Sequence, residues 1–201
     1  MTTPRPILSR KRDLVYLTYF LVHVVVMFVG DLAPLYPDSI RPQFMDNMRQ
    51  WYIEQYQDRF FTSPPIRLSA LTKNVSRAWF GVYMYMEALY HVPVSFWSIG
   101  ALIRGLLCTM EALFVPRLIS ADDPKVPLHL LVYACQTGFT TLTCIADYLG
   151  WTDYSNEQKL ALSYLYMPYL AVSVFMGLDM FARLSKRLSE NGNAAEAKKL
   201  Q

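Results

Sequence analysis

Six ionisable side chains lie inside or at the ends of long apolar stretches of this 201-residue chain: His23, Asp31, Glu87, His91, His129 and Asp147. An acidic side chain near the middle of a membrane-spanning helix costs about 2.5 to 3.5 kcal/mol on insertion scales, so we expect Glu87 to face protein rather than lipid. His91 follows Glu87 by four residues, which places both side chains on one face of a helix. Pro93 follows closely, and we expect the backbone geometry that it imposes to leave room for a cavity.

A carboxyl and an imidazole on one helix face supply the acid and the base that proton-transfer chemistry needs. The same pair also fits a structural role, in which the two polar groups hydrogen-bond neighbouring helices together. A proton relay is disfavoured, because no further groups continue the chain across the membrane. The residues alone leave the first two roles open.

Four apolar stretches are long enough to form the helices that position these residues: 14–30, 79–103, 127–146 and 160–178. Each is close to or above the roughly 20 residues that cross a bilayer core. The composition agrees, since 53% of the residues are hydrophobic and only 17% are charged. Such a composition excludes a disordered chain and disfavours nucleic acid as a partner. We therefore predict an all-α membrane protein with a four-transmembrane-helix bundle.

Basic residues predict the orientation of this bundle. With a cytosolic N-terminus, twelve basic residues lie on the cytosolic side and seven on the other. We therefore expect residues 1–12 and 183–201 to be cytosolic. The first helix is expected to be retained, because no signal-peptidase site follows it. Lys198 and Lys199 occupy the positions of a dilysine signal, which coat proteins read to return proteins to the endoplasmic reticulum; the alternative is a solvated basic tail.

Cys108, Cys135 and Cys144 are odd in number and lack paired spacing, so they predict neither a disulfide framework nor a zinc site. We expect them to be packing residues and expect no metal or cofactor. The sequon at Asn74 lies directly before the second apolar stretch, where the bilayer shields it, and it is expected to be unmodified.

The loop between the first two apolar stretches is expected to be folded. Between Pro42 and Pro64, aromatic and apolar residues recur at three- and four-residue spacing: Phe44, Met48, Trp51, Tyr52 and Tyr56. This spacing predicts an amphipathic helix that lies on the lipid interface or caps the bundle. Neither placement explains why Asp58 follows this helix directly, or why Asp31 ends the first stretch.

The order of several motifs resembles the four-helix EXPERA domain. The matching residues are the run from Tyr19 to His23, Gly30-Asp31-Leu32, Trp51-Tyr52, Asp58, Pro64-Pro65, Glu87, Pro93 and Tyr166-Met167-Pro168-Tyr169-Leu170. The match covers roughly residues 12 to 182, of which we assign 13–182 to the domain. It is most similar to the sigma-2 receptor (transmembrane protein 97) branch and also similar to the fungal relatives named for efficient mitochondrial targeting. The resemblance implies an endoplasmic reticulum protein, often homodimeric, whose cavity opens to lipid and accepts sterols or cationic amphiphiles.

The resemblance also assigns a ligand-binding set. Asp31 is the carboxylate that pairs with a ligand ammonium, and Asp58 is its hydrogen-bonding partner; two such carboxyls in a dry cavity are expected to share one proton. The resemblance adds Glu87, Thr141, Tyr166 and Tyr169. His23 and His91, the ionisable residues of the first two apolar stretches, complete the expected ligand-binding set. Thr140 is an alternative to Thr141, and His91 stands where the sigma-2 pattern has an amide.

Two other functions remain beside this receptor hypothesis. Another EXPERA branch isomerises a sterol double bond with acidic and histidine side chains, and Glu87 and His91 offer both types. That branch places histidine before glutamate, however, whereas this chain has the reverse order. The second alternative is a helper in protein targeting or quality control that binds no small molecule. We predict a receptor or lipid-handling protein rather than an enzyme.

Overall fold

The computed structural model describes residues 10–37, 39–62, 78–107 and 125–199. Every regular element in these residues is helical, as the long apolar stretches predict. Cys108 and the sequon at Asn74 lie outside the described residues.

The first helical segment comprises α1, Lys11–Val26, and the π-helical turn η2, Met27–Asp31, and is followed by the short 3-10 turn η3, Ala33–Leu35. α2, Gln43–Tyr56, and the single turn α3, Arg59–Thr62, come next. The second long segment is continuous and consists of α4, Ala78–Met86, the π-helical turn η6, Glu87–His91, and α5, Val92–Leu107. α6, Lys125–Leu149, and α7, Asn156–Lys199, complete the order.

Among the described residues, three segments are long and apolar enough to cross a membrane: Lys11–Asp31, Lys125–Leu149 and Asn156–Asn193. They contain three of the four predicted stretches, 14–30, 127–146 and 160–178. The fourth stretch, 79–103, lies within the continuous α4–η6–α5 segment, which is long enough to span. Its mean hydropathy is lower than that of the three segments above, because Glu87, His91 and several tyrosines lie within it. Its membrane crossing therefore stays a prediction.

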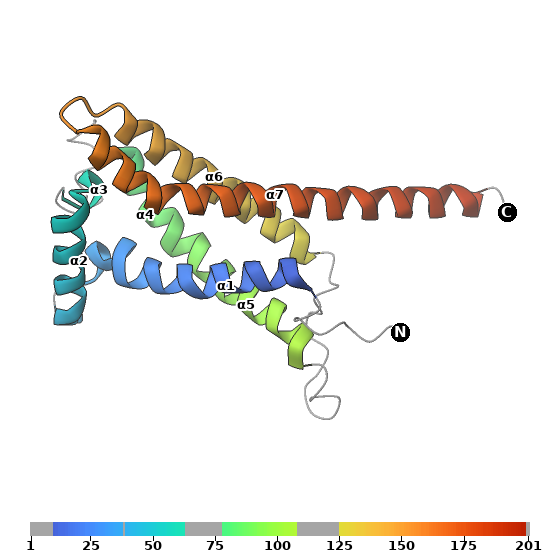
Figure 1. The fold of residues 1–201 in the computed structure, drawn as a ribbon. Coiled ribbons are helices and arrows are strands. Elements are labelled where there is room, and N and C mark those ends of the chain that lie inside the picture. Colours follow the sequence, from blue (N-terminus) through green and yellow to red (C-terminus); the bar gives the residue numbers. More distant parts are fainter. Residues whose placement is uncertain (1–9, 38, 63–77, 108–124, 200–201) are drawn as a thin grey trace.

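The long helices form a bundle in which α6 packs along α7 and α1 packs against α5 (Figure 1). The start of α1 and the end of α7 lie at the same end of the bundle, whereas α2 lies across the other end, and α7 extends well past its neighbours (Figure 1). Large apolar side chains on the outer surface remain exposed, among them Val25, Leu89, Phe139 and Leu178. Such an apolar surface suits a lipid environment.

Two clusters of buried side chains hold the bundle together. One joins α1, α5, α6 and α7 through residues that include Tyr16, Phe20, Leu130 and Met176. The other surrounds Phe60 of α3 and includes Tyr148, Trp151 and Leu162 of the α6–α7 hairpin. α3 is therefore anchored to the bundle, which fixes the residue directly before it, Asp58.

A network of charged side chains joins α1 to α7 near the end of the bundle where α1 begins. Asp179 forms ion pairs with Arg12 and Arg183, each at 2.7 Å, and accepts a 2.8 Å hydrogen bond from the Tyr16 hydroxyl. Arg183 also pairs with Asp13 at 2.8 Å. Arg183, predicted to begin a cytosolic tail, is thus part of the helix contact, and α7 continues as a helix to Lys199.

Candidate functional site

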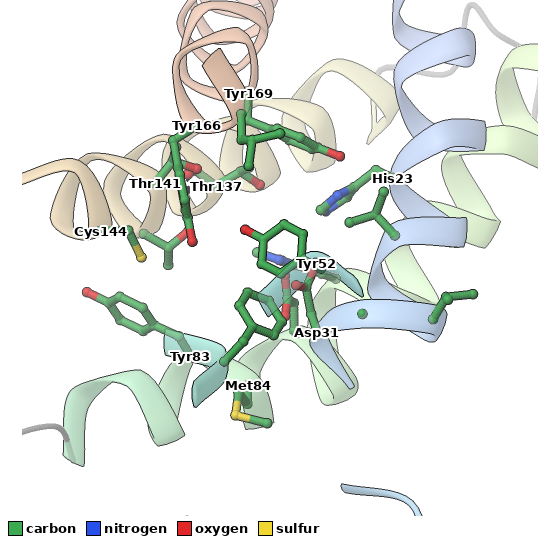
Figure 2. Close-up of a pocket in the computed structure, with 18 of the residues that line it drawn as sticks. His23, Asp31, Tyr52, Tyr83, Met84, Thr137, Thr141, Cys144, Tyr166 and Tyr169 are labelled. Atoms are coloured by element: carbon green, nitrogen blue, oxygen red, sulfur yellow. Dashed lines mark hydrogen bonds between the residues drawn. The ribbon is translucent and has the colours of Figure 1, made fainter. Parts of the chain in front are cut away.

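A cavity of about 400 Å³ opens between the first helical segment, α2, α4, η6, α6 and α7. This volume lies within the range of small-molecule sites in proteins. Its walls are mainly apolar and aromatic, and the polar side chains converge from different helices (Figure 2). The polar and titratable lining residues are His23, Asp31, Arg49, Tyr52, Tyr83, Glu87, His91, Thr137, Thr140, Thr141, Cys144, Tyr166 and Tyr169.

Two π-helical turns present the acidic residues of the cavity. η2 ends at Asp31, and its widened turn is closed by a 2.8 Å bond from the Leu32 amide to the Met27 carbonyl. η6 begins at Glu87 and ends at His91, directly upstream of Pro93. Proline cannot donate to the carbonyl four residues earlier and clashes with it, which explains a widened turn at this point. Such π-helical turns are frequent at functional sites.

Asp58 is fully buried behind the cavity wall and satisfied by three donors. Its Oδ2 accepts hydrogen bonds from the hydroxyls of Tyr52 and Tyr166, both at 2.8 Å, and its Oδ1 accepts one from the Phe60 amide at 2.9 Å. Gln57, which ends α2 in a left-handed conformation (φ 50°), turns the chain toward this position. Asp58 therefore joins α2, α3 and α7 at one carboxylate.

Tyr52 couples this buried carboxylate to the cavity. Its ring lies in the cavity lining beside Asp31 in Figure 2, and its hydroxyl donates to Asp58. Burial and the nearby Asp58 charge raise the pKa of Tyr52 well above its ordinary value, so the hydroxyl stays protonated and acts as a donor. Asp31 and Asp58 themselves lie within electrostatic reach of each other.

His23 and His91 enter the cavity from α1 and η6. Their side chains are buried, and the ring of His23 stacks on Tyr19 with centroids 5.3 Å apart. The ring of His91 contacts Tyr133 at 4.7 Å. Both nitrogens of each imidazole lack a hydrogen-bond partner within the described part of the chain. The aromatic contacts hold the rings in place, whereas the nitrogens remain available.

The structure brings seven of the eight predicted ligand-binding residues into the cavity wall, and the eighth, Asp58, lies directly behind it. Thr140 and Thr141 both line the cavity, so the alternative between them stays open. The other two ionisable residues of the apolar stretches lie elsewhere: His129 packs on Trp97 at 5.0 Å, and Asp147 accepts a 3.0 Å bond from the Trp151 indole.

Sequence reasoning missed several lining residues. Cys144 packs in the cluster around Phe60, as expected, and it also lines the cavity, as does Thr137. Cys135 is exposed, contrary to the expectation that it packs. Tyr52, expected to anchor α2 at the interface or in a cap, instead bonds to Asp58. The helical spacing of Thr137, Thr141 and Cys144 on α6 was the available signal, because residues three and four apart share a helix face.

An aromatic, mainly apolar cavity with a carboxylate in its wall can bind an amphiphilic molecule and neutralise one positive charge. The fold and the site thus define a helical membrane protein with a cavity of small-molecule size among its helices.

Residues 44–180 match the family described as EXPERA (EXPanded EBP superfamily), and the chain belongs to this family. It is similar to Sigma intracellular receptor 2 of Xenopus tropicalis, with 22% identity over 86% of this chain and 89% of the relative. The Homo sapiens protein of the same name is 21% identical over 81% of this chain and 82% of the relative. Efficient mitochondria targeting-associated protein 19 of Schizosaccharomyces pombe is 24% identical over 87% of this chain and 77% of the relative.

Proposed function

We propose that this protein is an endoplasmic reticulum membrane protein whose cavity binds sterols or cationic amphiphiles. In this role it acts as a receptor or a regulator of lipids and membrane proteins. The observation that carries the proposal is the position of Asp31, which lines a mainly apolar cavity while Asp58 behind it is occupied by three donors. The similarity to proteins named Sigma intracellular receptor 2 supports a receptor over an enzyme.

The chemistry favours a ligand with one positive charge. Hydrogen bonds to a carboxylate stabilise its ionised form, so Asp58 acts as a fixed structural charge. Asp31 then holds the proton that the two carboxyls are expected to share, and it would give up this proton when it meets a ligand ammonium. Aromatic faces of Trp51, Tyr83 and Tyr169 line the same cavity and attract both cations and apolar ring systems. A neutral sterol would gain mainly from apolar burial.

We further propose that α4–η6–α5 is the fourth spanning segment and that both termini are cytosolic. The excess of basic residues on that side supports this orientation. The start of α1 and the end of α7 lie at the same end of the bundle, which is compatible with it (Figure 1). Lys198 and Lys199 would then present a dilysine signal to cytosolic coat proteins. The family resemblance also suggests a homodimer.

Replacement of Asp31 by Asn tests the ligand site. Asp31→Asn keeps the side-chain volume and removes the charge, so binding of an amphiphilic amine is expected to weaken by 2 to 5 kcal/mol, roughly 30-fold to several thousand-fold. Asp58→Asn is expected to weaken binding less, because this residue acts through Asp31. Radioligand competition on protein shown to be folded by circular dichroism measures both. Equal amine affinity in the wild type and in Asp31→Asn would remove Asp31 from the site.

Sterol double-bond isomerisation is a second candidate function. His23, Glu87 and His91 lie together in the cavity, and they include the acid and base types that such proton transfers use. Incubation of the purified protein with a sterol carrying the isomerisable double bond tests this activity. Turnover that Glu87→Gln abolishes would favour the enzyme over the receptor.

A further inference from the structure

Three side chains from two helical segments converge on one point in the cavity. His23 comes from α1, whereas Glu87 and His91 come from the two ends of η6. One imidazole nitrogen from each histidine and one carboxylate oxygen of Glu87 lie within 4.8 Å of one another. All three residues line the cavity, and Figure 2 shows the His23 ring directed into it.

Within the described part of the chain, the two histidines of this cluster are buried and their ring nitrogens have no hydrogen-bond partner. His23 is 5% exposed and His91 is 2% exposed, and neither ring nitrogen of either residue is bonded within the described residues. Buried polar atoms in proteins nearly always have a partner, so each exception calls for an explanation. Among the described residues, all four ring nitrogens of these two adjacent histidines lack a hydrogen-bond partner.

The residues around the two imidazole rings hold them in place before any metal ion binds. Tyr19 stacks on His23, and Tyr133 packs on His91, so aromatic contacts restrain both imidazoles. Gln136 lies beside His91, and its Oε1 is buried and forms no hydrogen bond of normal geometry within the described residues. Metal-binding histidines usually donate their second ring N–H to such an oxygen, which fixes the tautomer and orients the ring.

We propose that His23, Glu87 and His91 bind a divalent first-row transition metal of the zinc type. Two imidazoles and one glutamate are an established donor set for Zn²⁺, and this set leaves a fourth position open. Here that position would face the cavity. A tetrahedral ion with bonds of about 2.0 to 2.1 Å holds its ligand atoms about 3.3 to 3.5 Å apart, so modest side-chain movements would close the cluster.

The charge at the site also fits a divalent cation. Glu87 supplies one negative charge to the cluster, and Asp31, another carboxyl of the cavity wall, lies within electrostatic reach of Glu87. Sequence spacing did not predict a metal site, because the third ligand, His23, lies on another helix. The proposal goes beyond the proposed receptor function and does not depend on it.

Titration of the full-length protein with Zn²⁺ tests the site. The protein is purified in detergent, stripped with a chelator and titrated by calorimetry, and Co²⁺ serves as a spectroscopic probe of tetrahedral coordination. We expect one ion per chain. His23→Gln and His91→Gln are each expected to weaken Zn²⁺ binding more than about 100-fold, because even loss of an outer partner costs 10- to 100-fold. Gln136→Ala, which removes only an outer partner, is expected to weaken Zn²⁺ binding by about 10- to 100-fold.

The chain offers a matched control, since it contains three histidines in all. The third, His129, packs on Trp97 outside the cluster, so His129→Gln is expected to bind Zn²⁺ like the wild type. Each variant is checked for folding by circular dichroism. No Zn²⁺ binding by folded, stripped wild type would overturn the proposal, as would equal losses in His129→Gln and His91→Gln. Asp31→Asn separates the two proposals, because it is expected to weaken amine binding at least about 30-fold and to retain Zn²⁺ binding.

Discussion

Tyr166 donates a 2.8 Å hydrogen bond to the buried carboxylate of Asp58, although 108 positions separate the two residues in the chain. Tyr166 lies on α7, and Asp58 lies between α2 and α3. This contact ties the polar loop segment to the longest helix of the bundle. It also places the charge of Asp58 behind the cavity that Asp31 faces.

Removal of the Tyr166 hydroxyl is expected to destabilise the protein. Tyr166→Phe leaves the ring in place but deprives a buried carboxylate of one donor, which costs about 1 to 3 kcal/mol of unfolding free energy. Thermal unfolding in detergent micelles measures the change. Tyr164→Phe is the control, since Tyr164 is 72% exposed. Equal stability of the two variants would contradict this role of the hydroxyl.

Tyr169 is expected to contribute to both ligand classes. Its ring lines the cavity and contacts Tyr19 and His23. Tyr169→Ala removes a cation–π partner of about 0.5 to 2 kcal/mol, together with apolar contact area, so amine affinity should fall about 2- to 30-fold. Sterol affinity should also fall, unlike in Asp31→Asn.

Competition binding with an amine and a sterol measures both effects of Tyr169→Ala. Phe181→Ala serves as a control, because Phe181 is 62% exposed. A loss confined to the amine would mean that Tyr169 does not contact the sterol.

The ion network between α1 and α7 is expected to stabilise the bundle. Asp179 is buried. It forms ion pairs with Arg12 and Arg183 and accepts a hydrogen bond from the Tyr16 hydroxyl. Loss of one partner of a buried pair typically costs 3 to 5 kcal/mol. We expect about 2 to 3 kcal/mol for Asp179→Ala, because Arg183 is 35% exposed and solvent screens part of the interaction.

Arg12→Ala provides the comparison for the network. The Arg12 side chain is 67% exposed, so its loss is expected to cost no more than about 1 kcal/mol. Thermal unfolding of both variants under one detergent condition measures the difference. A larger loss in Arg12→Ala than in Asp179→Ala would reverse this ranking.

Replacement of Lys198 and Lys199 by serine is expected to release part of the protein to post-Golgi membranes, because coat proteins read the two ammonium groups. Fluorescence microscopy of the full-length protein measures the redistribution. Substitution of Lys186 and Arg187 removes two basic residues outside the signal and is the control. Unchanged localisation of the Lys198/Lys199 variant would contradict the dilysine hypothesis. A C-terminal tag that resists protease in intact microsomes would show that the orientation is the reverse of the one proposed.

The sequence by itself determined the helical class and most of the candidate site. Long apolar stretches can satisfy their backbone in lipid only as helices or closed barrels, and stretches of about 20 residues have the length of a spanning helix rather than of a spanning strand. Asp31 and Glu87 stood out because carboxyls in apolar segments are costly. The EXPERA resemblance added Asp58, Thr141, Tyr166 and Tyr169, which composition and spacing alone would not have selected.

The tertiary structure decided which of these groups face one another. Helical spacing joins Glu87 to His91, but no local rule reports that His23 on α1 completes their cluster. In the same way, the partners of Asp58 depend on how α2, α3 and α7 pack. Sequence periodicity records the face of a helix that is buried, whereas the residues that meet across a cavity follow from the packing of separate helices.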